Sequence, residues 1–328
     1  MKKLHFFLQI ACAFLAAGNA RAIITYGESN DDAKILYDGS ATAAELSVVS
    51  CNSASAVYLG GGWFITANHV GAAENMNIYQ NGASAKISAV NNSLYENYGA
   101  DLTLFYCADV SNLEYLAAAN LSADIYSSIS SAKFGYKTTY PGGVKTYTPT
   151  CTKGTYLTLV GAGYGRSPAS RLDDAHVAGD GAVGTMRSGE ASVFAHTADE
   201  NGVGQIITIP EYAVEGSAQA LIGDSGGGLF YEDAQGTFYL AGIMAGVAPS
   251  AYGVDFNSYE NIALNFSPSG TPTGIDYSGV LAKSYTLSVN LSDYIPDIQA
   301  IISVPEPSNI ALLLGIFAAA FLILRRKN

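Results

Sequence analysis

Short apolar segments separated by glycines are the feature that most constrains the fold of this chain. The 328 residues include 35 glycines, and the triplet Gly60-Gly61-Gly62 divides two apolar runs. The sequence contains no amphipathic helical pattern much longer than about ten residues. The spacing is typical of antiparallel strands joined by tight turns, and it predicts an all-β fold. Strands are expected within the ranges 46–49, 56–59, 63–70, 102–107, 156–160, 191–195, 205–209, 227–231 and 238–246.

Two segments fall outside this strand pattern. Residues 247–275 are rich in proline, glycine and asparagine, and we expect a long surface loop there. Residues 283–302 are expected to hold a final strand or a short helix.

The N-terminus has the layout of a secretory signal peptide. Lys2 and Lys3 precede an apolar run, 6–17, and the small-x-small site Ala20-Arg21-Ala22 follows. We therefore expect residues 1–22 to be removed during export and the mature chain to begin at Ile23.

The C-terminus combines Val304-Pro305-Glu306-Pro307, an apolar run over 310–324 and a basic end, 325–327. As a helix the run would reach about 22 Å, short of the ~30 Å hydrocarbon core, so it predicts transient membrane contact. This layout resembles the PEP-CTERM sorting tail of Gram-negative bacteria. The resemblance implies that residues 299–328 are a linker and sorting tail handled by an exosortase-type machinery. It also implies a location in the cell envelope or outside the cell; a plain C-terminal anchor is the alternative.

Charge excludes one class of partner. Residues 23–304 hold 27 acidic and 10 basic residues, a formal charge of −17. Such a surface would repel phosphate backbones, so we expect no nucleic-acid binding.

Three cysteines remain after signal removal: Cys51, Cys107 and Cys151. In an oxidising compartment we expect one disulfide and one buried thiol, and the sequence leaves open which two residues pair. The cysteines and histidines lack the spacing of metal ligands, so no metal site is expected.

The segment Gly223-Asp224-Ser225-Gly226-Gly227 carries the strongest chemical signal. A serine needs a base to take its proton and donors to meet the charge on the substrate carbonyl. Flanking glycines let the backbone turn sharply and approach a substrate. On its own the segment also fits an acidic glycine turn, or the nucleophile elbow of an α/β-hydrolase.

Chain order decides among the hydrolase arrangements. The α/β-hydrolases place their histidine after the serine, but the mature chain has only His69, His176 and His196, all before Ser225. A subtilisin-like order would need an acid before His69, where the aspartates lack a supporting strand. The order His, Asp, Ser remains.

His69 and Asp101 complete this order. His69 follows the apolar run 63–67, which suits a general base on a rigid element, and Asp101 opens the apolar run 102–105. His176 and His196 have no partners at ligand spacing, and we interpret them as surface or structural residues.

These segments resemble the trypsin-like serine proteases. Residues 66–70 (Thr-Ala-Asn-His-Val), 101–104 (Asp-Leu-Thr-Leu) and 223–229 (Gly-Asp-Ser-Gly-Gly-Gly-Leu) are similar to that family's histidine, aspartate and serine boxes. Weaker similarities lie at 160–165 and 240–247. The resemblance covers roughly 23–298 and implies two six-stranded β-barrels, divided near 125–150, with the site between them and an apolar C-terminal helix beyond.

The resemblance also implies roles for individual residues. Ser225 would be the nucleophile, His69 the general acid and base, and Asp101 the group that orients the imidazole. The backbone N–H groups of Gly223 and Ser225 would form the oxyanion hole. The expected activity is a secreted endopeptidase that hydrolyses protein or peptide substrates without a cofactor.

Departures from the family pattern keep a second function open. Val70 stands where the family has a cysteine, Gly228 where it has a proline, and Ala245 where it has a serine. Gln219 and Val247, with Ala245, would line a pocket for small uncharged side chains. The alternative function is a catalytically weak protease-fold protein that binds peptides or extracellular matrix components.

A further expectation concerns activation. Signal cleavage after Ala22 exposes Ile23, and the resemblance implies that its α-ammonium could pair with Asp224. The alternative is that other groups hold Asp224.

Overall fold

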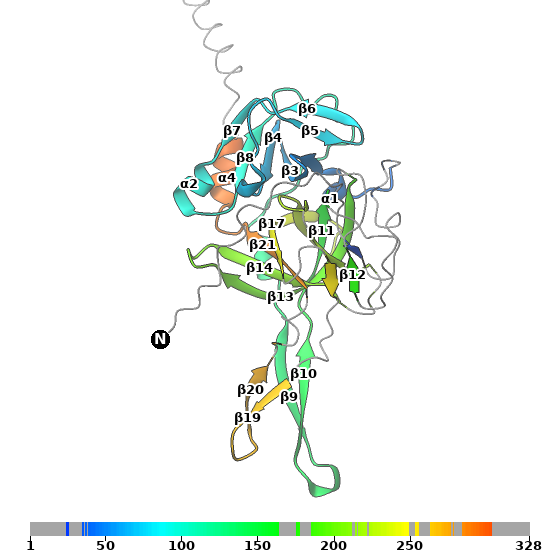
Figure 1. The fold of residues 1–328 in the computed structure, drawn as a ribbon, viewed down its shortest axis with the longest axis vertical. Helices are drawn as coiled ribbons and strands as arrows, with labels where there is room; N and C mark the ends of the chain where they lie inside the picture. Colours follow the sequence, from blue (N-terminus) through cyan, green and yellow to red (C-terminus); the bar gives the residue numbers. More distant parts are fainter. Residues whose placement is uncertain are drawn as a thin grey trace, which may run out of the picture.

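The computed structural model describes residues 39–163, 185–211, 216–221, 223–248, 263–276 and 284–303, together with 24–25, 35, 37, 175–177, 214, 253–255 and 278. The described chain is mostly β, and its two halves lie one above the other (Figure 1). The signal peptide, Ile23 and the apolar run 310–324 lie outside the described residues. Within those residues, no helix is long and apolar enough to cross a membrane.

The first half is a curled seven-stranded sheet in the order β6-β5-β2-β3-β4-β8-β7. Its neighbouring strands are antiparallel, and tight turns join β2 to β3, β3 to β4 and β5 to β6. Their bounds are β2 Val48–Cys51, β3 Ala54–Gly60, β4 Trp63–Thr66, β5 Asn77–Gln80, β6 Ala83–Lys86, β7 Ala89–Asn91 and β8 Thr103–Tyr106.

The second half is a closed six-stranded barrel in the order β11-β13-β14-β21-β17-β16, in which β16 pairs with β11 to complete the ring. Bulges in β13 and β17 interrupt the register where these long strands bend around the barrel. The strands are β11 Tyr156–Gly161, β13 Arg187–Ala198, β14 Gly204–Ile209, β16 Gly228–Glu232, β17 Phe238–Ala248 and β21 Tyr285–Asn290.

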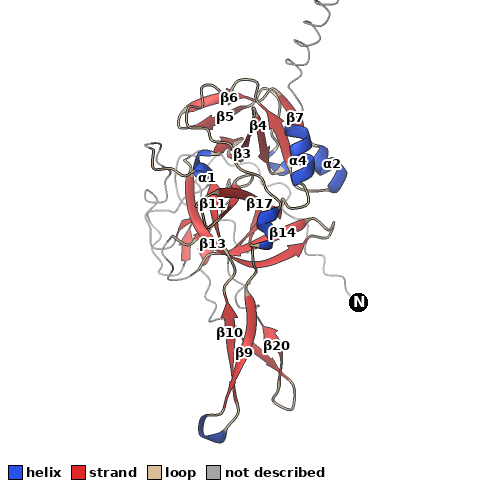
Figure 2. Ribbon diagram, turned by 180° about the vertical axis from the view of Figure 1, so that it is seen from behind, coloured by secondary structure: helices blue, strands red, loops and turns tan. Residues whose placement is uncertain are grey.

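A two-stranded arm projects from the barrel (Figures 1 and 2). We call residues 133–152 the arm; it consists of β9 Lys133–Thr139, the turn η3 Pro141–Gly143 and β10 Thr146–Thr152. A second hairpin, β19 Ala263–Phe266 with β20 Pro272–Asp276, lies beside it. Two further pairs join β1 Ile24–Thr25 to β15 Ala218–Gln219, and β12 Ala175–Val177 to β18 Gly253–Asp255.

The helices are short: α1 Ala43–Leu46, α2 Ser93–Tyr98, η1 Asn68–Val70, η2 Asp124–Ser127 and α4 Ile295–Ile302. α4 follows the last barrel strand but lies against the first half, next to α2 (Figure 1). Tyr294 and Ile298 are buried in the core of that half, and the Tyr98 hydroxyl donates to Asp297 at 2.7 Å. The C-terminal helix α4 therefore packs against the first half although it follows a strand of the second half.

One hydrophobic core crosses the boundary between the halves. Val57 and Leu104 of the sheet belong to the same buried cluster as Val160, Phe230 and Ile243 of the barrel. The sheet and the barrel therefore share part of their buried apolar core.

The predicted strands agree with the structure, with some differences. All nine predicted ranges contain strand residues, but the structure closes only the second half into a barrel and leaves the first as a curled seven-stranded sheet. The predicted loop over 247–275 is wrong in part, because β19 and most of β20 lie within it. Residues 283–302 hold both a strand, β21, and a helix, α4.

Candidate active site

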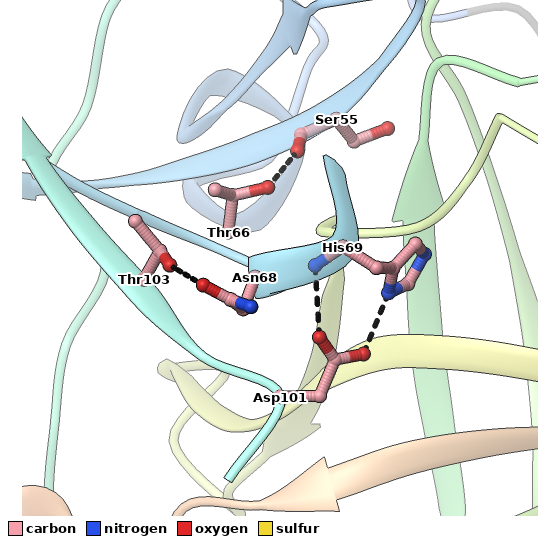
Figure 3. A network of polar contacts seen from close by, with 6 residues as sticks. All are labelled: Ser55, Thr66, Asn68, His69, Asp101 and Thr103. Carbon is pink, nitrogen blue, oxygen red and sulfur yellow. Dashed lines mark hydrogen bonds and ion pairs between the residues drawn. The ribbon is translucent and has the colours of Figure 1, made fainter. Parts of the chain in front are cut away.

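His69 lies in the turn η1 that directly follows β4. The Thr66 hydroxyl at the end of β4 donates to the Ser55 carbonyl at 2.7 Å, and the Thr103 hydroxyl donates to the Asn68 side-chain oxygen at 2.7 Å (Figure 3). Gly71 ends the turn in the left-handed conformation, φ 71°, which favours glycine. Hydrogen bonds therefore hold the residues before His69, and after it the Gly71 N–H donates to the Asn68 carbonyl at 3.0 Å.

Asp101 contacts His69 through both carboxylate oxygens. Oδ2 lies 2.6 Å from Nδ1 of the ring, and Oδ1 accepts from the His69 backbone N–H at 2.9 Å. The other ring nitrogen, Nε2, points away from Asp101 (Figure 3). This two-point contact orients the imidazole and favours a proton on Nδ1, which leaves Nε2 as the acceptor.

The loop that carries Ser225 packs against the strands that lead to His69. The Ser55 backbone N–H donates to the Ser225 carbonyl at 2.9 Å, and Ser55 O in turn accepts from Thr66. Gly226 fits only without a side chain, because a Cβ would meet Ser55 O and the Thr66 hydroxyl at 2.1 Å each. Ser55 thus links Ser225 to Thr66 at the end of β4, two residues before η1 begins.

Two backbone N–H groups of the Ser225 loop have no hydrogen-bond acceptor among the described residues. The N–H groups of Asp224, Gly226 and Gly227 donate to carbonyls within the protein. In the described part of the chain, those of Gly223 and Ser225 donate to no protein acceptor. Gly223 has φ +92°, and Ser225 is the one residue of 223–230 that is not fully buried. The loop can therefore present two N–H groups to an anionic oxygen beside the hydroxyl.

Asp224 is fully buried directly before Ser225. Its Oδ1 accepts from the Gly163 N–H and its Oδ2 from the Leu221 N–H, both at 2.8 Å. The carboxylate thus fixes the loop to the end of β11. Ile23, the expected partner of Asp224, lies outside the described residues.

The expected pocket residues gather near β21. Gln219 is fully buried and its side-chain amide donates to the Tyr285 carbonyl at 3.1 Å, while Val247 pairs with Thr286. Ala245 lies at the β17 bulge and packs against the core. The Gln219 Oε1 is buried and has no hydrogen-bond partner among the described residues.

The structure shows what surrounds two of the residues that depart from the trypsin-like pattern, Val70 and Gly228. Val70 is buried, and its carbonyl accepts from the Asn52 side chain. At Gly228 a Cβ would meet the Phe230 ring at 2.2 Å, so a proline there would require the ring to move.

The expected disulfide is not formed in this structure. Cys51, Cys107 and Cys151 are free thiols. Cys51 and Cys107 are buried in the first half, whereas Cys151 lies in the arm. Burial raises the pKa of Cys51 to about 12, and burial together with the nearby Cys51 raises that of Cys107 to about 12.

Several residues that support the site could not be predicted from the sequence. Ser55 donates to the Ser225 carbonyl, and its hydroxyl accepts from the Ala162 N–H at 2.9 Å and donates to the Gly223 carbonyl at 3.4 Å. No local motif marks Ser55, since the partners of its hydroxyl and of its backbone N–H are more than 100 residues away in sequence.

The two other histidines of the expected mature chain lie on strands of the second half. His196 lies on β13 at the surface, and His176 lies on β12. Within the described ranges, no group of three or more His, Cys, Asp or Glu side chains could hold a metal ion.

Comparison with known proteins gave no match: no protein-family model matches the chain, and no curated protein does.

Proposed function

We propose that the protein is a secreted serine endopeptidase with His69, Asp101 and Ser225 as its catalytic triad. The observation that carries the proposal is the two-point contact of Asp101 with His69, 2.6 Å to Nδ1 and 2.9 Å to the backbone N–H. A carboxylate that only closed a turn would not need to orient an imidazole ring. The contact favours the tautomer in which Nε2 can accept a proton.

The Ser225 loop supplies the complementary half. It is held on one side by Ser55 of the sheet and on the other by Gly163 of the barrel, through Asp224. Rigid placement of a nucleophile and its donors contributes much of the rate of acyl transfer, because little ordering remains to be done in the transition state.

In the proposed reaction, Ser225 Oγ attacks the substrate carbonyl carbon while Nε2 of His69 takes the hydroxyl proton. The negative charge that develops on the carbonyl oxygen is met by the Gly223 and Ser225 N–H groups. The protonated imidazole, stabilised by Asp101, then gives its proton to the leaving amine. Water repeats the sequence on the acyl-enzyme and releases the acid.

The wider assignments are part of the same proposal. The trypsin-like arrangement of two barrels is supported by a closed six-stranded barrel beside a curled sheet, with the candidate site at their shared core. Export by residues 1–22 and sorting through a PEP-CTERM tail rest on the sequence patterns of the two ends.

The decisive experiment uses an active-site probe. Wild-type protein should label with a fluorophosphonate and hydrolyse a mixed peptide library. Ser225→Ala should not label and should lower kcat on the order of 10⁶-fold. Ser217→Ala, at a buried serine directly before β15, is the matched control and should still label. If the folded wild type neither labels nor cleaves, the enzyme proposal fails and the peptide-binding alternative takes its place.

A further inference from the structure

The arm differs in charge from the rest of the protein. Residues 133–152 contain Lys133, Lys137 and Lys145 and no acidic residue, whereas residues 23–304 as a whole have a formal charge of −17. The neighbouring hairpin, residues 263–276, contains one charged residue, Asp276 at the end of β20. Among the described residues, the arm projects furthest from the barrel, and it is basic on an acidic protein (Figure 1).

The tip of the arm is apolar and exposed. Val144 is 67% exposed and Tyr140 is 64% exposed, the two highest values among large hydrophobic side chains of the described residues. They flank the turn Pro141–Gly143 at the end of the hairpin. Lys145 follows directly, with its ammonium 5.0 Å from the centre of the Tyr147 ring.

Aromatic contacts brace the arm against the barrel. At its base the Phe134 ring lies 5.4 Å from Phe194 of β13. Further out, Tyr147 contacts Tyr136 at 5.6 Å and Phe266 of the second hairpin at 6.1 Å. The arm is therefore supported along its length, while its tip carries exposed apolar groups.

Because an exposed apolar tip is followed by lysines, we propose that the arm docks the protein on an anionic phospholipid bilayer. The tip would lie at the membrane interface. Tyrosine prefers the headgroup level of a membrane, and lysines close behind the tip would meet anionic headgroups. The proposal does not depend on catalysis.

The length of the arm resolves the charge conflict with the acidic body. Seven residues per strand at about 3.4 Å each extend about 24 Å, and the Debye length at physiological salt is only about 8 Å. The acidic body can remain beyond the range at which an anionic surface repels it. A linear polyanion would instead lie along the lysines and would gain nothing from an apolar tip.

The test measures binding of the purified full-length chain to sedimenting vesicles of phosphatidylcholine, with and without about one third phosphatidylglycerol. The proposal expects stronger binding to the anionic vesicles, weakened by salt. Lys137→Gln should weaken that binding about fivefold, and Lys145→Gln similarly. Lys86→Gln, at an exposed lysine of β6, should change nothing. Tyr140→Ser should also weaken binding, whereas Tyr95→Ser, at an exposed tyrosine of α2, should not.

All variants keep residues 310–324, so any binding through that segment is common to every comparison. Unchanged thermal unfolding midpoints would show that the variants fold. In a Tyr140→Trp variant, indole emission should shift to the blue with anionic vesicles. Equal binding to both vesicle types, or equal effects of arm and control variants, would overturn the proposal. Binding to dextran sulfate or to single-stranded DNA without binding to vesicles would overturn it too, in favour of a soluble polyanion.

Discussion

Asp101 touches both the ring and the backbone of His69, so substitution at this residue separates its charge from its geometry. Asn at position 101 keeps the size and can still reach the His69 backbone N–H. Its amide N–H₂, however, would favour the opposite imidazole tautomer. At residue scale, the site is therefore sensitive to single atoms.

Asp101→Asn should lower kcat about 10⁴-fold, because Nε2 would already be protonated and could not accept the proton of Ser225. That factor corresponds to about 5.4 kcal/mol of barrier. Folding should change little. Steady-state kinetics on a library-selected peptide measure it. Asp124→Asn, at an exposed aspartate of η2, is the control, and an unchanged rate in Asp101→Asn would remove Asp101 from the triad.

Gly226 offers a test of how tightly the Ser225 loop is seated. Its φ of +81° nearly equals that of Gly236, +78°, but a Cβ at 226 would meet two oxygens at 2.1 Å. At Gly236 the nearest atom would be 3.7 Å away. Gly236→Ala should cost about 1–2 kcal/mol of backbone strain, whereas Gly226→Ala should cost on the order of 4 kcal/mol or more. Urea unfolding compares the two, and equal losses would show that the loop can move away from Ser55.

At the scale of elements, the sequence predicts strands best where burial is continuous. β4 and β8 are uninterrupted apolar runs, and both appear where expected. The arm has no such run: threonines alternate with other residues over Thr146–Thr152, and lysines, a glycine and threonines interrupt Lys133–Thr139. Pro272 and Gly274 made β20 resemble a loop, although an unburied edge strand tolerates both.

The same contrast holds for the site. The three proposed triad residues lie in local motifs that can be found one at a time. The supporting contacts of Ser55 and Asp224 depend on how distant strands meet, and no local pattern carries that information.

The first half buries two thiols, and we expect its stability to fall at alkaline pH for this reason. The pKa of Cys51 rises from about 9 in the unfolded chain to about 12 in the folded protein, so the unfolded state loses its proton first. The stabilisation is complete below pH 9 and is lost as pH rises toward 12. Near pH 10.5 the loss should be about 2 kcal/mol for this thiol.

Urea unfolding at pH 8 and near pH 10.5 measures this loss. Cys51→Ala should show a smaller fall in unfolding free energy between the two pH values than wild type. Cys151→Ala, at a thiol that is only partly buried, should keep most of the wild-type fall. Identical pH dependence in all three proteins would contradict the assignment of Cys51 as a buried, protonated thiol.

At the scale of the whole molecule, folding and location should be separable. Deleting residues 305–328 should leave peptidase activity unchanged, because α4 already ends the described fold at Ile302. The same deletion should change where the protein is found, because it removes the proposed sorting tail. Cell fractionation and kinetics on both forms measure the two effects. Unchanged distribution would contradict the sorting proposal, and lost activity would show that the tail belongs to the fold.

The hydrogen bond between the Ser55 N–H and the Ser225 carbonyl also has a consequence for when the proposed site can form. A chain that crosses a membrane N-terminus first delivers the strands of His69 and Asp101 more than 100 residues before the serine loop. That loop in turn depends on Met244, whose carbonyl accepts from the Gly226 N–H. The proposed nucleophile therefore reaches its base only after most of the barrel has emerged and closed. We therefore expect the proposed enzyme to be inactive during the proposed export and to become active only once the barrel has folded.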